Sequence, residues 1–224
     1  MTEEELNILK NGEMLSCNLT AKGSNYTFLS ELNLNGKNLF VIYKPRKGEA
    51  PLWDFPSGTL YKRECASFVL DELLDWNIIP TTIIRDGTYG IGSVQLFVDH
   101  NPNNNYYQLN NSHIDELKKI ACFDLIANNT DRKADHVIID LDNKLWGIDQ
   151  GLTFHSDIKI RTVIWDFQGE DIPQILLDDI NQLKEQLTNI NGIHPFGDLL
   201  NELEQQALID RLGLVMDLGQ YPSL

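Results

Sequence analysis

The chain has 224 residues, 42% of them hydrophobic, which is enough for a sizeable core in one domain or two closely apposed lobes. Its 18 basic and 33 acidic residues give a net charge of −15, and the densest basic cluster is only Lys44, Arg46 and Lys47, so we expect no nucleic-acid partner. No segment reaches the ~20 apolar residues of a membrane span, and residues 1–5 lack the features of a secretion signal, so we expect no transmembrane segment and a cytoplasmic location.

The first half of the chain consists mainly of segments typical of strands. Strand-forming residues dominate there, and Asn35-Gly36 is a turn of the kind that joins two antiparallel strands. A stripe of apolar residues at helical spacing predicts one helix in this half. In chain order we predict strands over 16–20, 24–32 and 38–44, a Pro- and Gly-rich loop over 45–60, a helix over about 62–75, and strands over 81–85 and 93–98.

The composition changes after residue 99. Residues 100–112 are Asn-rich and polar, which predicts a linker or a surface loop, and helical patterning dominates beyond them. In chain order we predict a helix over 114–126, strands over 137–140 and 144–148, a helix that Pro173 opens and that runs to about 190, and a helix over 196–214.

This order of elements indicates an α+β fold with two lobes. We expect residues 1–98 to form a strand-rich N-lobe. Residues 99–224 would form a helical C-lobe.

Residues 128–151 hold the pattern that points to a reaction. Asp131-Arg132 follows an Asn-Asn-Thr loop, His136 comes five residues after Asp131, and Asp149 follows a short apolar strand. A kinase needs one Asp to orient the attacking hydroxyl, a polar side chain five residues later to hold a metal, and a further Asp to bridge that metal to the ATP phosphates. An isolated Asp-x-Gly is usually a turn, so the signal lies in the combination.

His136 is the unusual member of this set, because asparagine more often fills its position. Imidazole suits transition metals better than Mg²⁺, which prefers oxygen ligands. His136 could instead bond a phosphate oxygen or the backbone of Asp131, with Asp135 as the metal ligand. The sequence leaves these alternatives open.

Lys44 ends the predicted strand over 38–44 and shares one face with Phe40 and Ile42, because side chains alternate along a strand. A kinase needs such an anchored cation over the α- and β-phosphates, held by a carboxylate from a neighbouring helix. In the helix that follows, periodicity slightly favours Glu72 over Glu64 as the inward-facing carboxylate.

Short segments spread over about residues 20–180 resemble those of one enzyme family, the type II phosphatidylinositol 4-kinases and their short bacterial relatives in the phosphatidylinositol 3-/4-kinase-like group. Asn129-Thr130-Asp131-Arg132 is identical to the opening of the family's catalytic loop. Similar segments are the phosphate loop at 23–28, Tyr43-Lys44-Pro45, Glu64-Cys65-Ala66-Ser67, Asn77-Ile78-Ile79-Pro80, the hinge at 92–98, and Ile148-Asp149 with Gly151-Leu152.

The resemblance implies a bilobal protein-kinase-like fold. The phosphate loop, the lysine strand, a helix and the hinge would lie in residues 1–98, and the catalytic loop, the metal-binding segment and the C-terminal helices in residues 99–224. It also implies a role for individual residues. It favours Glu64 as the partner of Lys44, and it implies that ATP is bound with a magnesium ion, or with manganese. The implied catalytic residues are Asp131, Arg132, Lys44 and Glu64; the implied nucleotide-binding residues are Gly23, Ser24, Asn25, Lys44, Gln95, Leu96, Phe97 and Val98; the implied metal ligands are Asp149 and His136.

The chain also departs from the family, with His136 in place of asparagine and Trp53-Asp54-Phe55-Pro56 in place of a cysteine-rich insertion. We expect a kinase that transfers the γ-phosphate of ATP to a hydroxyl of a lipid headgroup or a protein, and the acidic surface makes a protein acceptor attractive. Two alternatives remain: a nucleotide-binding pseudokinase that acts as a regulatory or interaction module, and an enzyme that transfers the nucleotide instead of the phosphate.

Overall fold

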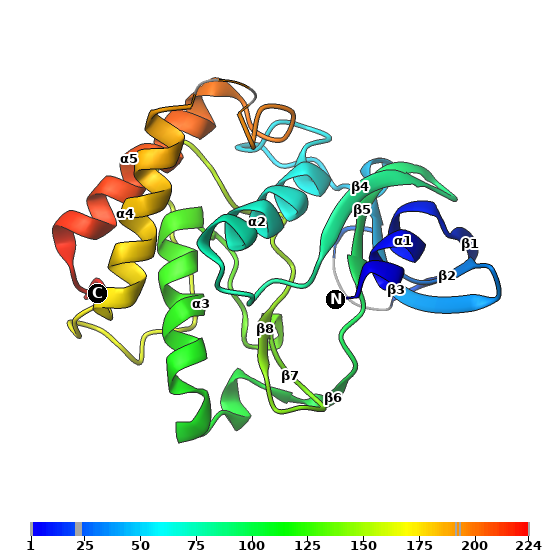
Figure 1. Cartoon of the computed structure of the whole chain (residues 1–224), viewed down its shortest axis with the longest axis horizontal. Helices are drawn as coiled ribbons and strands as arrows, with labels where there is room; N and C mark the ends of the chain where they lie inside the picture. The colour runs from blue at the N-terminus through cyan, green and yellow to red at the C-terminus, as the bar shows by residue number, and fades with distance from the viewer. Residues whose placement is uncertain (1, 21–23, 191, 193, 224) are drawn as a thin grey trace.

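The computed structural model describes residues 2–20, 24–190, 192 and 194–223. It has the predicted α+β organisation in two lobes, with a five-stranded sheet at one end and the long helices α3, α4 and α5 at the other (Figure 1). Helix α2 runs between the two ends. The helices are α1 (Glu3–Asn11), α2 (Leu60–Leu74), α3 (Ile114–Ala127), α4 (Gln174–Thr188) and α5 (Glu202–Leu218).

The strands form two antiparallel sheets. The first has the order β1-β2-β3-β5-β4, and the second has the order β6-β7-β8. The strands are β1 (Glu13–Leu19), β2 (Phe28–Leu34), β3 (Lys37–Pro45), β4 (Thr82–Gly87), β5 (Gly90–Leu96), β6 (His100–Asn105), β7 (Val137–Asp140) and β8 (Leu145–Gly147).

Strand β3 separates a small core from the side of the sheet that carries Lys44. Its residues Val41 and Tyr43 are fully buried in a cluster to which α1 contributes Ile8 and Leu9. Because side chains alternate, Lys44 leaves the strand on the opposite face. The first sheet therefore uses one face for its own core and the other for the site described below.

Helix α1 was not predicted, although the sequence carries a signal for it. Thr2 and Glu5 form a capping box, in which the Glu5 N–H donates to Thr2 Oγ1 at 3.2 Å and the Thr2 N–H donates to Glu5 Oε2 at 2.7 Å. This Thr-x-x-Glu pattern is a recognised start of a helix. The helix packs against β2 and β3.

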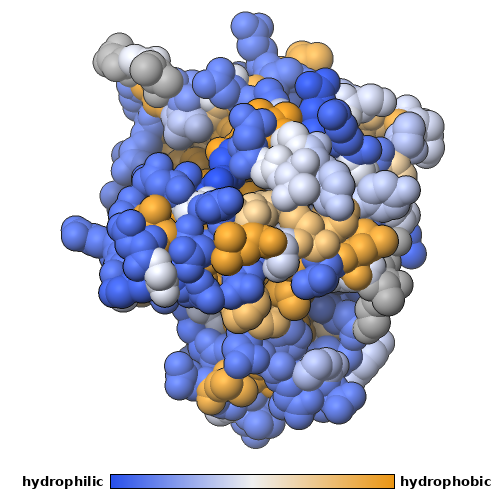
Figure 2. Space-filling model, turned by 90° about the vertical axis from the view of Figure 1, so that its right-hand side faces the viewer, coloured by the Kyte–Doolittle hydropathy of each residue, from blue (hydrophilic) through white to orange (hydrophobic). Residues whose placement is uncertain are grey.

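The outer part of the first sheet exposes apolar side chains. Leu15 and Leu19 on β1 and Phe40 on β3 are each at least half exposed. Figure 2 shows apolar side chains gathered on this end of the molecule among polar ones. Strand β1 is an edge of the sheet, so Leu15 and Leu19 have no neighbouring strand beyond β1 in the described chain, whereas Phe40 lies on an inner strand.

The larger core joins α2 to the second half of the chain. Ala66, Leu70 and Leu74 of α2 belong to the same buried cluster as Phe123 of α3 and Leu212 of α5. Helix α2 also contacts β4 and β5 of the first sheet. It is therefore shared by both lobes, and the division of the chain at residue 98 stays a prediction.

Two further element assignments differ from the sequence-based ones. Residues 100–112, predicted as a linker or loop, contain β6, whose pairing with β7 is irregular and none of whose residues is buried. Helix α5 begins at Glu202 instead of 196, because Asn201 and Glu204 form its capping box. None of the described helices is both long and apolar enough to cross a lipid bilayer.

The turn after α2 is held by a buried carboxylate. Asp71 accepts hydrogen bonds from the N–H groups of Ile78 and Ile79 at 3.0 and 2.9 Å. Burial raises the pKa of Asp71 to about 6, although these N–H groups favour the charged form. Asp71 thus fixes the path from α2 into β4 at a cost in stability when it is ionised.

The stability of the chain should depend on pH through Asp71. The folded state holds the Asp71 proton up to about pH 6, whereas the ordinary pKa is 3.8, so this contribution to stability falls between pH 4 and pH 6. The difference of about two pH units corresponds to about 3 kcal/mol. Asp71→Asn removes the charge and keeps one acceptor oxygen. The free energy of unfolding is measured with urea for the variant and for the unchanged chain. The difference between them should shift in favour of the variant by up to about 3 kcal/mol from pH 4 to pH 7. A difference that is the same at both pH values would contradict this assignment.

Candidate active site

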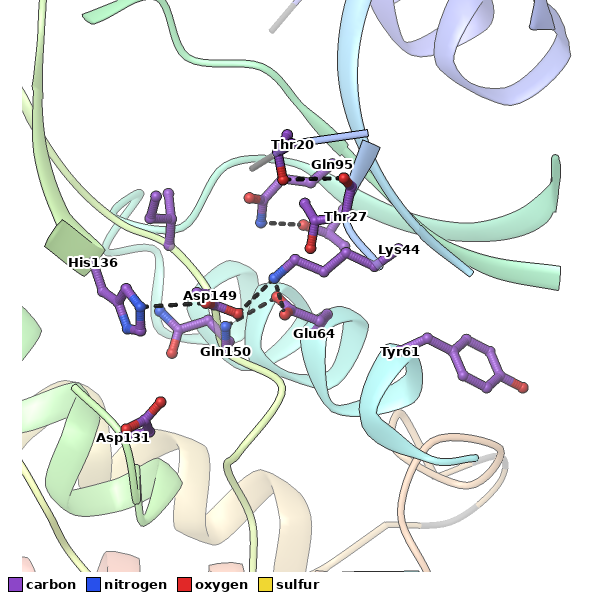
Figure 3. A network of polar contacts seen from close by, with 12 residues as sticks. Thr20, Thr27, Lys44, Tyr61, Glu64, Gln95, Asp131, His136, Asp149 and Gln150 are labelled. Carbon is purple, nitrogen blue, oxygen red and sulfur yellow. Dashed lines mark hydrogen bonds and ion pairs between the residues drawn. The ribbon is translucent and has the colours of Figure 1, made fainter. Parts of the chain in front are cut away.

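Lys44 lies between two carboxylates that come from different parts of the fold. Its Nζ contacts Oε1 of Glu64, from the second turn of α2, and lies 2.7 Å from Oδ1 of Asp149, which follows β8 (Figure 3). Glu64 is buried, whereas Glu72 is exposed, so the preference of periodicity for Glu72 is wrong. The first sheet, α2 and the second sheet therefore meet at one ammonium group.

The charges of these three groups depend on one another. Burial opposes the charge of Lys44, but Asp149 and Glu64 hold the pKa of Lys44 above its ordinary value. Lys44, and to a smaller degree His136, holds the pKa of Asp149 well below its usual range, against the effect of burial. Burial raises the pKa of Glu64, and Lys44 opposes that rise. One cation between two carboxylates leaves an excess of negative charge that a metal ion can balance.

Asp149 is presented to solvent by a constrained backbone. Its φ is +60°, a left-handed conformation that is uncommon for residues other than glycine, and its side chain is 52% exposed. Oδ2 of Asp149 lies 3.3 Å from Nε2 of His136. Burial lowers the pKa of His136, although Asp149 opposes that change. Asp149 and His136 are thus adjacent, as a pair of metal ligands would have to be.

Asp131 lies near the site but apart from the contacts of Lys44 with Glu64 and Asp149 (Figure 3). Its N–H donates to Asn129 Oδ1 at 3.0 Å, and its Oδ2 lies 2.6 Å from Nζ of Lys133. Asp131 lines the same cavity as Lys44 and Asp149. The structure therefore brings all three side chains to one space without direct contact between Asp131 and the other two.

Arg132 is buried beneath this space and lines neither of the cavities described next. Its guanidinium group binds Asp124 at 2.7 and 2.9 Å. It also donates to the backbone carbonyls of His136 and Ile148, each at 3.1 Å. Arg132 thus joins the segment that carries His136 to the segment that carries Asp149.

Two cavities meet at Lys44 and Asp149. A larger one of about 480 Å³ is bounded by residues 95–98, by Ile42 from the first sheet, and by Ile148 from the second half of the chain. A smaller one of about 120 Å³ is bounded by Glu64, Asp131 and residues 24–27, which precede β2. The larger cavity has the apolar walls that a flat aromatic base needs, and the smaller one has the charged groups that phosphates need.

The segment over 95–98 offers few free backbone groups. The N–H of Leu96 donates to the carbonyl of Thr81 at 2.8 Å, and the N–H of Phe97 donates to the carbonyl of Phe40 at 3.1 Å. The Val98 carbonyl is 2.8 Å from Nδ1 of His100, and the Gln95 side chain donates to Thr82 Oγ1 at 2.8 Å. Among the hydrogen bonds of the described residues, the Val98 N–H has no backbone partner, so it can donate a hydrogen bond to a nucleotide base.

The predicted phosphate loop is only partly described. Gly23 lies outside the described residues, as does Lys22. Ser24 and Asn25 line the smaller cavity. Asn25 Oδ1 accepts the N–H of Ala50 at 2.7 Å, which ties this loop to the loop after β3.

Arg63 was missed by sequence reasoning and anchors the helix that carries Glu64. It is 1% exposed, contacts Glu204 of α5, and donates to the carbonyl of Thr153 at 2.6 Å. The N–H of Gln150 donates to Glu64 Oε2 at 3.0 Å. Helix α2 is therefore bound both to α5 and to the segment that follows Asp149. The partners are too far apart in sequence for any local pattern to reveal them.

Removal of one charge of the Arg63–Glu204 pair should lower the free energy of unfolding more than removal of both charges. Arg63→Met leaves a buried carboxylate without its cation, which should lower the free energy of unfolding by about 3–5 kcal/mol. Glu204→Gln keeps the capping box of α5 and removes only the charge. The double variant should recover part of the loss in urea unfolding, with a clear coupling energy between the two sites. Additive effects of the two substitutions would show that the pair is not coupled.

Comparisons with known proteins agree with this geometry. Residues 57–200 match the family described as phosphatidylinositol 3- and 4-kinase. Protein Rv2133c of Mycobacterium tuberculosis is 34% identical over an alignment 222 residues long, and the match covers 84% of this chain and 80% of that protein. The crystal structure of the Helicobacter pylori proinflammatory kinase CtkA shares the fold, with a TM-score of 0.50, 14% identity and 92% of each chain covered. The chain therefore belongs to the phosphatidylinositol 3- and 4-kinase family.

Proposed function

We propose that this protein is an ATP-dependent kinase that transfers the γ-phosphate to a hydroxyl group, with the nucleotide bound between the lobes formed by residues 1–98 and 99–224. One observation carries the proposal. The Nζ of Lys44 contacts Glu64 and Asp149 at the junction of an apolar cavity and a charged cavity. A kinase needs this order of base site, anchored cation and metal carboxylate.

The larger cavity takes the adenine. Ile42 and Ile148 bound it from opposite lobes, and the N–H of Val98, which has no backbone partner among the described residues, would donate to the base. Gln95, Leu96 and Phe97 shape this cavity through the strand and hinge contacts that already occupy their polar groups.

The smaller cavity takes the phosphates. Lys44 contacts them as a fixed cation, because Glu64 of α2 holds its side chain. Ser24 and Asn25 line this cavity and would offer polar groups to the phosphates.

Asp131 orients the acceptor hydroxyl and accepts its proton. Its carboxylate lines the phosphate cavity, and the backbone around it is held by Asn129. Arg132 does not touch the cavity, so we assign it a positioning role through the carbonyls of His136 and Ile148. Lys133 next to Asp131 adds a cation to the part of the cavity where charge develops on the transferred phosphoryl group.

The donor groups fit a divalent metal ion. Asp149 offers a half-exposed carboxylate, and the neighbouring imidazole of His136 offers a nitrogen 3.3 Å away. The metal supplies charge neutralisation on the phosphates when it is bound. Such ions are commonly held by one or two protein ligands, with phosphate oxygens and water completing the shell.

Asp149→Ala should abolish metal-dependent turnover of ATP, by about 10³-fold or more, because the bridge between metal and phosphates is lost. The measurement is release or transfer of radiolabelled γ-phosphate with magnesium or manganese. Asp142→Asn is a matched control, since Asp142 is an exposed aspartate in the turn between β7 and β8. It should turn over ATP like the unchanged chain. Retained turnover in a folded Asp149→Ala variant would rule out the metal role of Asp149.

The acceptor is tested in the same assay. The net charge of −15 disfavours an anionic membrane surface, so we propose a protein hydroxyl as the acceptor. Labelled ATP is offered with phosphatidylinositol vesicles in one arm and with cell lysate in the other. Label in lipid alone would overturn the choice of acceptor, and ATP binding without γ-phosphate loss under both metals would make the chain a pseudokinase. Transfer of the whole nucleotide is recognised by the mass added to the product.

A further inference from the structure

The hairpin of β7 and β8 delivers two side chains to one point. His136 precedes β7 and Asp149 follows β8, and the two strands pair with Val137 opposite Gly147. The N–H of Ile148 donates to the carbonyl of His136 at 2.9 Å. This ladder and Arg132 therefore hold the backbone beside His136 and the backbone beside Asp149 in a fixed relation to each other.

The two oxygens of Asp149 have different neighbours. Oδ1 lies 2.7 Å from Nζ of Lys44, and Oδ2 lies 3.3 Å from Nε2 of His136 (Figure 3). With metal–ligand distances of roughly 2.0–2.2 Å, adjacent ligands of a six-coordinate ion are about 3 Å apart. The spacing of Oδ2 and Nε2 therefore suits two ligands of a single ion.

The chemistry of this pair differs from that of two oxygens. The described residues contain no cluster of three or more His, Cys, Asp or Glu side chains that could hold a metal, so the protein offers one nitrogen and one carboxylate here. Mg²⁺ demands oxygen ligands in near-ideal octahedral geometry, whereas first-row transition metals also accept imidazole. A nitrogen ligand thus contributes selectivity that a second carbonyl or carboxylate oxygen would not.

We propose that Asp149 and His136 form a mixed carboxylate–imidazole site that selects a first-row transition-metal dication over Mg²⁺ as the partner of the nucleotide. This inference rests on the proposed ATP site. It makes His136 a determinant of metal specificity, bound to the ion through Nε2, while Lys44 remains on the other oxygen of Asp149.

The test uses Mn²⁺ as the probe, because its unpaired electrons report directly on neighbouring nuclei. The full chain is mixed with Mn²⁺ and the β,γ-methylene analogue of ATP, which has no bridging nitrogen, and pulsed electron paramagnetic resonance is recorded. A ¹⁴N coupling typical of bound imidazole is expected. Histidine labelled with ¹⁵N in the unchanged chain should convert that coupling to ¹⁵N, which identifies histidine without any substitution.

Two variants assign the signal and measure selectivity. His136→Asn should lose the nitrogen coupling and should lower the ratio of Mn²⁺ to Mg²⁺ affinity, measured by competition, by about tenfold or more. His100→Asn is the matched control, because His100 also borders the larger cavity but makes no contact with Asp149 among the described residues, and it should keep the coupling.

The outcomes separate this inference from the proposed function. Binding of Mn²⁺ and nucleotide without a histidine coupling, or with an unchanged metal ratio in His136→Asn, overturns the metal selectivity and leaves the nucleotide site intact. Failure of the chain to bind Mn²⁺ with the nucleotide at all overturns both.

Discussion

The ion-pair arrangement around Lys44 is the interaction on which the rest of the site depends. Its ammonium group contacts a carboxylate from α2 and another from the segment after β8, so three separate elements must be correctly placed for it to form. A buried cation is tolerated only when its charge is matched, and here each partner also stabilises the charged form of Lys44. The contact therefore forms only when both lobes have the correct relative position.

Helix α2 is the element that makes this possible. Its apolar residues pack into the core of the second half, while its second turn presents Glu64 to Lys44 of the first sheet. Arg63, the residue before Glu64, is bound to α5 and to Thr153. Movement of α2 away from the site would break buried contacts on both of these sides. The structure thus favours an assembled site in the absence of nucleotide, since the anchoring contacts need no ligand.

Much of the site was predictable because its signals are local. Alternation along β3 predicts the face on which Lys44 lies, and the spacing of Asp131, His136 and Asp149 predicts a loop, a strand pair and a second carboxylate. The antiparallel register of β7 and β8 then brings the ends of that pair together. The metal and catalytic roles of these residues remain predictions, whereas their proximity is a property of the structure.

The parts that could not be predicted depend on contacts between distant segments. Periodicity favoured Glu72 because it assumes a helix with one buried face, but α2 is covered by both lobes, and residues such as Arg63 and Glu64 are buried outside the apolar stripe. Strand β6 was not predicted because its Asn-rich sequence has low strand propensity. Its pairing with β7 forms the strand in spite of that propensity. Arg63 and Glu204 carry no local signal, since each would be an ordinary solvated charge in an isolated helix.

The charge of the chain constrains the chemistry of its ligands further. A net charge of −15 creates a field that opposes the approach of a free triphosphate, and Lys44 is already matched by two carboxylates. In the proposed function, a nucleotide that arrives with a divalent cation would carry less negative charge and would meet an excess carboxylate at Asp149, so the metal would contribute to binding as well as to reactivity. The same field penalises an anionic lipid surface, which cannot neutralise itself in this way. Higher salt shortens the range of both effects, and the half-exposed side chain of Asp149 is only partly shielded from it. A site of this kind therefore depends on its metal ion more strongly than a basic nucleotide-binding cleft would.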